Sequence, residues 1–284
     1  MQKRNILHSP RLLELKKHRR RVFLSKVLLF LLALSAIFAL LAYISRLPGL
    51  NISSLEIIGN KVIETGAIKD VVELNLKGKY FWLFPKTNVL FYPKNKIKQD
   101  LSLKFKRLKD IEFSIKDKQM LAVKLAEREA LYTWCGDNLP DIEKKTEEYL
   151  CYFTDENGYV FDEAPYFSGD VYFRFFGSLT ESYFIPGIFT KIVSFKDFLS
   201  NVGVKPVSLY VKSDGDIEIY LSSRYLPPEA PKIIFKKDFN PEKLSENLEA
   251  ALNTEPLLSD FKNKYSSLLY IDLRYGNKVY FKFK

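Results

Sequence analysis

An uncharged apolar segment, residues 27–44, constrains this chain more than any other feature of its sequence. Its 18 residues are just long enough to cross a bilayer, whose hydrocarbon core takes about 20 apolar residues in a helix. The alternatives are a secretory signal peptide, whose apolar region is usually about 7–15 residues long, and a buried core helix. A core helix would not follow a strongly basic tail, so we predict an uncleaved transmembrane signal anchor.

The basic residues of the tail predict the direction in which this anchor is inserted. Residues 1–26 hold nine of the 44 Lys and Arg residues and one acid, Glu14, so most of the net charge of +10 lies there. Positively charged flanks stay in the cytoplasm, which predicts a cytoplasmic tail, an extracytoplasmic main body and a type II topology in the cytoplasmic membrane. We expect the tail to set the topology, with affinity for anionic lipid as a secondary role. The lipid bilayer, and not nucleic acid, is the expected partner.

The histidine content excludes several kinds of catalytic site. Both histidines, His8 and His18, precede the apolar segment, so the main body has neither Ser-His-Asp catalysis nor a His-ligated metal. No glycine-rich phosphate loop occurs. Neighbouring carboxylates are interpreted as solvated: Glu127 and Glu129, Glu147 and Glu148, Asp162 and Glu163. We therefore expect no enzymatic activity, no cofactor and no small-molecule substrate.

The first exported region, residues 50–129, has the pattern of a small α+β domain. Alternating apolar residues predict a strand over residues 52–58, and helices are predicted to begin near Thr65 and Pro93. Two further strands, around 111–115 and 121–125, are separated by a polar turn. The order strand, helix, helix, strand, strand places the helices on one face of a sheet.

The second region, residues 130–284, is predicted to be a β-rich α+β domain. Helices are expected over residues 188–202 and after Asn240, which is placed to cap a helix that opens with a proline. Two strands close the chain, over residues 268–275 and 278–283, with a turn at Gly276-Asn277 between them.

Cys135 and Cys151 are the only cysteines, and a polar insertion, residues 136–150, separates them. A disulfide between them would close a short loop and would be worth about 3 kcal/mol in the loop-entropy model. Two small apolar core residues are the alternative, and a reactive or metal-binding thiol is a third reading.

The last strand is the strongest interaction candidate that the residues themselves offer. Alternation directs Val279, Phe281 and Phe283 to the core, and directs Tyr280, Lys282 and Lys284 to solvent. At a sheet edge, such a strand could pair with a strand of a partner. Its lysines could equally protect the edge against unwanted pairing.

Four segments, in chain order, carry a resemblance to a known family. They are Ile58-Gly59-Asn60-Lys61-Val62-Ile63, Glu127-Arg128-Glu129-Ala130, the stretch Phe153-Thr154-Asp155-Glu156-Asn157-Gly158-Tyr159-Val160-Phe161, and Tyr270-Ile271-Asp272-Leu273-Arg274-Tyr275-Gly276-Asn277-Lys278-Val279. Behind a signal anchor, this series resembles the FtsQ/DivIB bacterial cell-division proteins. The insertion at residues 136–150 departs from that pattern.

The resemblance implies a POTRA domain at residues 50–129, followed by the family's β domain. It implies a divisome scaffold that links FtsB/FtsL-like proteins to septal peptidoglycan synthesis by β-strand addition. Other divisome proteins, or the translocation machinery, would dock on the POTRA-like domain, at an edge strand over residues 52–58 or 121–125. By position, the partner-binding residues would be Arg274, Tyr275, Asn277, Lys278, Val279, Tyr280, Phe281, Lys282 and Phe283.

A second assembly role remains open. The chain could be a POTRA-bearing subunit of a secretion or outer-membrane assembly system that handles extended polypeptides. A membrane-anchored hydrolase, the third class, is opposed by the absence of histidine after residue 18.

Overall fold

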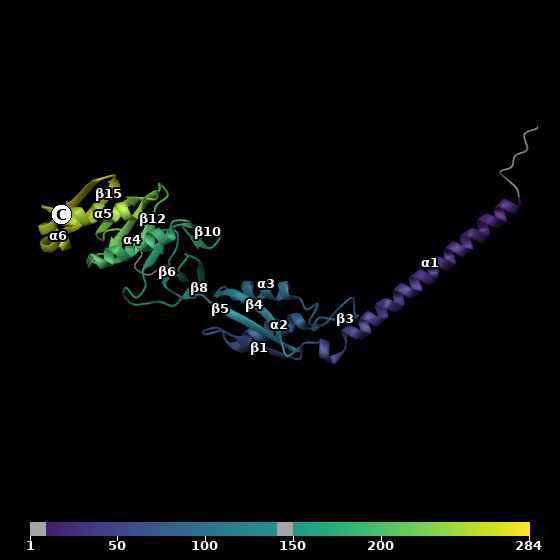
Figure 1. Ribbon diagram of the computed structural model, residues 1–284. Helices are drawn as coiled ribbons and strands as arrows, with labels where there is room; N and C mark the ends of the chain where they lie inside the picture. The colour runs from purple at the N-terminus through teal and green to yellow at the C-terminus, as the bar shows by residue number, and fades with distance from the viewer. Residues whose placement is uncertain (1–9, 141–149) are drawn as a thin grey trace, which may run out of the picture. The chain divides into compact units, whose positions relative to one another are not determined.

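The computed structural model describes residues 10–140 and 150–284 and divides the chain into two compact units (Figure 1). Unit 1 ends at Glu127 and unit 2 begins at Arg128, two residues before the boundary expected from the sequence. The side chains at this junction explain its place, because Glu127 binds backbone of unit 1 and Arg128 binds Asp155 of unit 2.

A single long helix, α1 (Pro10–Ser45), opens the described chain. Its part from Glu14 to Ser45 is long and apolar enough to cross a membrane, which indicates a single-pass membrane protein. The apolar side chains of this part are mostly exposed, as a lipid-facing surface requires. The helix ends three residues before Pro48, which has no N–H to continue it.

The rest of unit 1 is a three-stranded sheet with two helices. Its main elements are β1 (Ser54–Ile58), α2 (Thr65–Leu76), α3 (Lys94–Lys104), β4 (Leu108–Lys116) and β5 (Met120–Glu127). They lie where the sequence patterns place them. The sheet order is β1-β5-β4, with β1 parallel and β4 antiparallel to β5.

This order corrects one expectation about the sheet edges. Because β5 pairs with a strand on each side, the segment 121–125 is central and offers no free edge. The two edges are β1, as expected, and β4. Alternation along the chain identifies strands but does not show which of them lies in the middle of a sheet.

The core of unit 1 follows from residues spaced four apart on its helices. Ile68 and Val72 of α2, and Ile97 and Leu101 of α3, are completely buried. They pack against the inward side chains of β5 and β4. A short hairpin, β2 (Lys79–Tyr80) and β3 (Phe84–Pro85), connects the two helices. The sequence patterns predicted no strands there.

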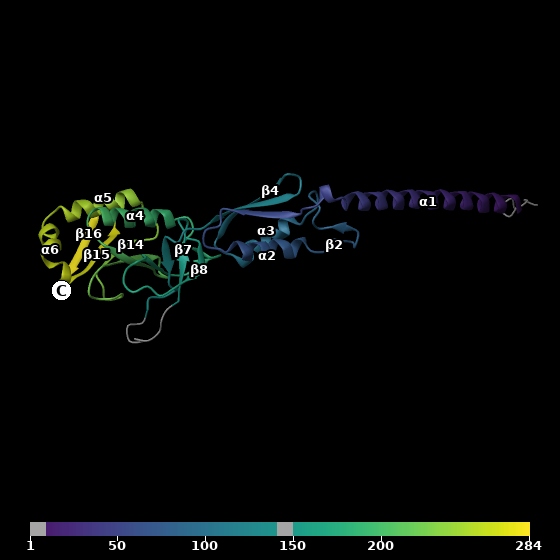
Figure 2. The same cartoon turned by 90° about the horizontal axis from the view of Figure 1, so that it is seen from below.

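Unit 2 is built on one sheet of nine strands, in the order β16-β15-β14-β13-β12-β9-β6-β7-β8 (Figure 2). The strands of its first half are β6 (Tyr132–Trp134), β7 (Cys151–Thr154), β8 (Val160–Ala164) and β9 (Arg174–Phe176). Those of its second half are β12 (Pro206–Val211), β13 (Asp216–Leu221), β14 (Lys232–Lys236), β15 (Leu268–Tyr275) and β16 (Lys278–Phe283). A small separate hairpin is formed by β10 (Leu179–Thr180) and β11 (Tyr183–Phe184).

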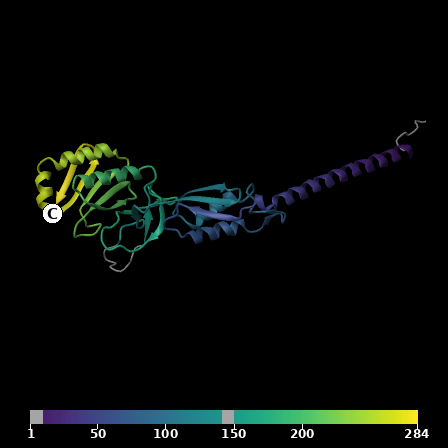
Figure 3. The same ribbon diagram turned by 60° about the horizontal axis from the view of Figure 1, so that its bottom comes forward.

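Two helices, α4 (Phe189–Asn201) and α5 (Pro241–Leu252), pack on one face of this sheet (Figure 3). Asn240 caps α5 as predicted, because its side chain accepts a hydrogen bond from the Lys243 N–H at 3.0 Å. A third helix, α6 (Leu257–Lys264), was not predicted and leads through a 3-10 turn (Tyr265–Ser267) into β15. The β-rich character expected after residue 130 is confirmed.

Candidate interaction surface

The closing hairpin places the last strand at an open edge of the nine-stranded sheet. A two-residue turn, Gly276-Asn277, joins β15 to β16, and Tyr275 pairs with Lys278 across it. Gly276 has a φ of 67°, which a residue without Cβ adopts easily. The side chain of Asn247 in α5 donates to the Gly276 carbonyl at 2.9 Å. The turn is therefore tied to the helical face, and β16 is the outermost strand.

The two faces of β16 differ as the alternation predicted. Val279, Phe281 and Phe283 are half-buried and pack against the main core of unit 2. Tyr280 and Lys282 are exposed. The strand is thus held by its apolar side and presents a polar and aromatic side to solvent.

The backbone of β16 also has two sides. The Lys284 N–H donates to the Ser267 carbonyl in the segment that leads into β15. N–H and C=O groups alternate in direction along a strand, so Lys278, Tyr280 and Lys282 also face β15. The N–H and C=O groups of Val279, Phe281 and Phe283 point to the open edge. The backbone of these three residues is therefore available for hydrogen bonds to a strand that pairs with this edge.

Two exposed tyrosines form the aromatic part of this surface. Tyr275 and Tyr280 are 57% and 49% exposed, and their rings meet edge to face with centroids 5.3 Å apart. Asn277, Lys278 and Lys282 are exposed beside them. We call the set the edge surface: Arg274, Tyr275, Asn277, Lys278, Val279, Tyr280, Phe281, Lys282 and Phe283.

Arg274 differs from the other members because its guanidinium is held inside unit 2. It binds both carboxylate oxygens of the buried Asp272, at 2.9 and 2.6 Å, and one oxygen of Asp216 at 2.5 Å. Burial opposes ionisation of Asp272, but the hydrogen bonds from Arg274 prevail and hold the pKa of this carboxyl below its usual value. The sequence patterns gave no role to Asp216, which lies 58 residues from Arg274 along the chain.

Two of the segments that carry the family resemblance contact each other in unit 1. The carboxylate of Glu127 accepts hydrogen bonds from the N–H groups of Lys61, Val62 and Ile63, at 2.8, 2.9 and 3.0 Å. Gly59 has a φ of 96°, and a Cβ there would lie 2.2 Å from the Leu125 carbonyl oxygen. Glu127 is therefore a structural anion that fixes a turn, which corrects its interpretation as a solvated carboxylate.

The third segment forms a turn around a buried acid in unit 2. The Asp155 side chain is fully buried and accepts hydrogen bonds from the N–H groups of Asn157 and Tyr159 at 2.9 and 3.0 Å. Arg128 neutralises this carboxylate at 2.5 Å and stacks 3.9 Å above the Tyr159 ring. Gly158, with a φ of 81°, allows the turn to approach Phe189. These residues hold the first strands of unit 2 together.

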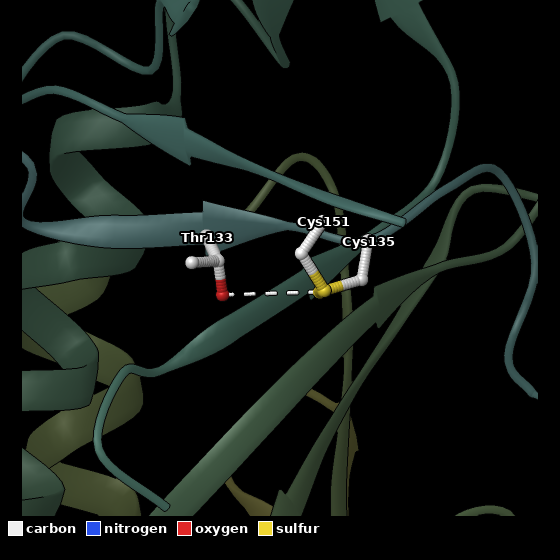
Figure 4. Close-up of a disulfide and its surroundings, with 3 residues drawn as sticks. All are labelled: Thr133, Cys135 and Cys151. Carbon is white, nitrogen blue, oxygen red and sulfur yellow. Dashed lines mark hydrogen bonds between the residues drawn. A yellow bond between two sulfur atoms is a disulfide. The ribbon is translucent and has the colours of Figure 1, made fainter. Parts of the chain in front are cut away.

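Cys135 and Cys151 form a disulfide, which settles the three readings of this pair (Figure 4). The Thr133 hydroxyl lies beside it and donates to the Cys135 sulfur at 3.8 Å. The bond fastens the end of β6 to the start of β7. Most of the insertion between the cysteines, including Glu147 and Glu148, lies outside the described residues.

Within residues 10–140 and 150–284, no group of three or more His, Cys, Asp or Glu side chains is placed to hold a metal ion. The edge surface is the site that the geometry favours for a function, because β16 is the outermost strand of the sheet. No family model matches the chain, and no curated protein shows significant sequence similarity to it.

Proposed function

We propose that this chain is a non-enzymatic scaffold of the bacterial cell-division complex. It is anchored in the cytoplasmic membrane by α1, with its basic tail in the cytoplasm and both units outside. Its edge surface pairs with a strand of an FtsB/FtsL-like partner and so links that partner to septal peptidoglycan synthesis. Strand addition needs neither a cofactor nor a catalytic group.

The open edge of β16 is the observation that carries this proposal. Val279, Phe281 and Phe283 face the edge with free N–H and C=O groups, while their side chains are anchored in the core. A partner strand would gain ladder hydrogen bonds there without displacing any part of unit 2. Tyr275 and Tyr280 stand beside the edge and would supply contact area and side-chain specificity.

Unit 1 supports the same assignment. The order strand, helix, helix, strand, strand, with β1 beside β5, is the arrangement expected of the POTRA domain that the resemblance implies. We propose that this domain docks other divisome proteins along β1 or β4, the two edges of its sheet.

A pair of variants at Val279 tests strand addition. Val279→Pro removes an N–H that faces the open edge, whereas Val279→Ala shortens the same side chain and keeps that N–H. The full chain in lipid nanodiscs is titrated with the membrane-proximal segment of the FtsB-like protein of the same organism. We expect the proline to weaken binding about tenfold or more, because one hydrogen bond is lost and the ring obstructs the partner backbone.

The alanine variant should bind within about threefold of the parent, and circular dichroism should show the same sheet content in both variants. Proline at Tyr280 is not a suitable test, because the N–H of that residue faces β15. Equal binding by the parent and Val279→Pro would refute strand addition at β16. Absence of binding by the folded parent would favour the secretion or outer-membrane role instead.

A further inference from the structure

An apolar hairpin tip stands fully exposed in unit 1. Phe81 and Trp82, between β2 and β3, are 88% and 90% exposed, and Leu83 beside them is 40% exposed. Both aromatic residues also have positive φ angles, 47° and 60°, which bulky side chains rarely adopt. Large apolar groups held outward at the tip of a strained turn mark a contact with something outside the chain.

The position of the hairpin identifies this contact. The ring of Phe84 in β3 lies against the ring of Phe38 in α1, with centroids 5.9 Å apart. Phe38 precedes Ile44 by six residues, which places it about 9 Å along the helix from the end of the apolar segment. The hairpin therefore reaches alongside the part of α1 that is apolar enough to cross a membrane (Figure 2).

Two polar contacts fix this segment at the end of α1. The Arg46 side chain donates to the Leu83 carbonyl at 3.2 Å, and the buried Asn88 donates to the Ser45 carbonyl at 3.1 Å. The hairpin is thus fastened to the last turn of the helix on both sides of β3. Its depth in a membrane would be set by the helix itself.

The charges around the hairpin suit a lipid surface. Residues 77–98 contain six lysines and no acid. Lys77 and Lys79 are exposed immediately before the aromatic tip. Aromatic side chains with flanking lysines are the usual composition of protein segments at the headgroup level of a bilayer.

We propose that the β2–β3 hairpin is a second membrane contact, in which Phe81 and Trp82 insert into the interface of the bilayer that α1 crosses. The lysines of residues 77–98 then bind anionic headgroups. The proposal rests on the membrane span of the preceding section and is independent of strand addition at β16. Because the hairpin is fastened to α1, the contact would fix the rotation and tilt of α1 and, with them, the orientation of unit 1 on the membrane surface.

The two tryptophans make a direct test. Trp134→Phe leaves Trp82 as the only tryptophan, and Trp82→Phe leaves Trp134, which is half-buried and donates to the Gly177 carbonyl at 2.8 Å. Each full-length variant is reconstituted into phosphatidylcholine–phosphatidylglycerol vesicles that contain lipids brominated at shallow or deep acyl positions. We expect Trp82 fluorescence to fall about twofold with shallow bromines and less with deep ones. Trp134 should not be quenched by either lipid.

Phosphatidylcholine vesicles without the anionic lipid test whether the lysines bind anionic headgroups. Quenching of Trp82 should decrease in these vesicles. Trp82 that is reached by aqueous acrylamide but not by bromolipid would overturn the proposal and would assign the hairpin to a protein partner. If the hairpin contact is overturned in this way, protection of α1 from protease in the same vesicles would show that α1 still crosses the membrane. Release of the chain by alkaline carbonate would overturn the span and the hairpin contact together.

Discussion

The carboxylate of Glu127 accepts a hydrogen bond from the backbone N–H of Lys61 at 2.8 Å, although 66 residues separate the two. The same carboxylate binds the N–H groups of Val62 and Ile63. It therefore joins the end of β5 to the turn that follows β1 and satisfies three donors that no neighbouring strand reaches.

Glu127→Gln should destabilise unit 1 by about 1–3 kcal/mol, because an amide provides one acceptor and turns its NH₂ toward donors. Hydrogen exchange of the peptide that contains residues 61–63, read by mass spectrometry, should accelerate. Glu73→Gln, at an exposed position of α2, is the control and should leave this peptide unchanged. Equal protection in Glu127→Gln and the parent would show that the carboxylate does not fix the turn.

The same contact predicts a dependence on pH. Burial acts against the charged form of Glu127, but the three N–H groups and Arg107 outweigh it and lower its pKa below the usual 4.5. A group with a lowered pKa in the folded state stabilises the fold above its unfolded pKa and loses this contribution as the pH falls through the folded pKa. Urea unfolding of the parent should therefore weaken below about pH 4.5 more steeply than that of Glu127→Gln. Parallel curves for the two proteins would contradict this.

The substitution Gly59→Ala should strongly destabilise unit 1. A Cβ would meet the Leu125 carbonyl oxygen at 2.2 Å, and the φ of 96° is strained for any L residue, so we expect a loss of about 3 kcal/mol or more. Gly66→Ala, in the first turn of α2, has no such conflict and should be neutral or slightly stabilising. Thermal unfolding of both variants decides this, and a neutral Gly59→Ala would mean that the turn after β1 relaxes freely.

Local periodicity accounts for the parts of the fold that were predicted well. Apolar spacing of four placed α2 and α3, and alternation assigned the core side of β16 correctly. Both signals arise from residues close in sequence, where the geometry of a helix or strand sets the period. The cap at Asn240 was visible for the same reason.

The features that the sequence did not predict depend mostly on contacts between residues far apart in the chain. The order β1-β5-β4 depends on which strands meet in space, so the central position of β5 could not be read from its alternation. The hydrogen bond from Arg274 to Asp216 spans 58 residues, and the short hairpin β2–β3 has no repeated pattern. The edge surface was therefore predicted as a strand and a turn, without the ion pairs that hold Arg274.

Arg274→Ala should destabilise unit 2 by about 2–4 kcal/mol, because it leaves the buried Asp272 without its bidentate partner. Adding Asp272→Asn should recover part of the loss, so the double variant should be less destabilised than the two single effects together predict. Urea unfolding of the four proteins gives this coupling. Additive losses would show that the two residues act independently and would return Arg274 to a purely partner-binding role.

Removing the disulfide should weaken unit 2 without abolishing its fold. The 16-residue separation of Cys135 and Cys151 corresponds to about 3 kcal/mol of loop entropy, and β6 and β7 remain paired by their ladder. The Cys135→Ala/Cys151→Ala variant should therefore unfold at lower urea concentration and keep the parent's circular dichroism. Alkylation before and after reduction, followed by mass spectrometry, tests the bond itself. The sample is folded, unreduced protein that was exported during expression. Alkylation of both cysteines in this sample would show that the disulfide does not form.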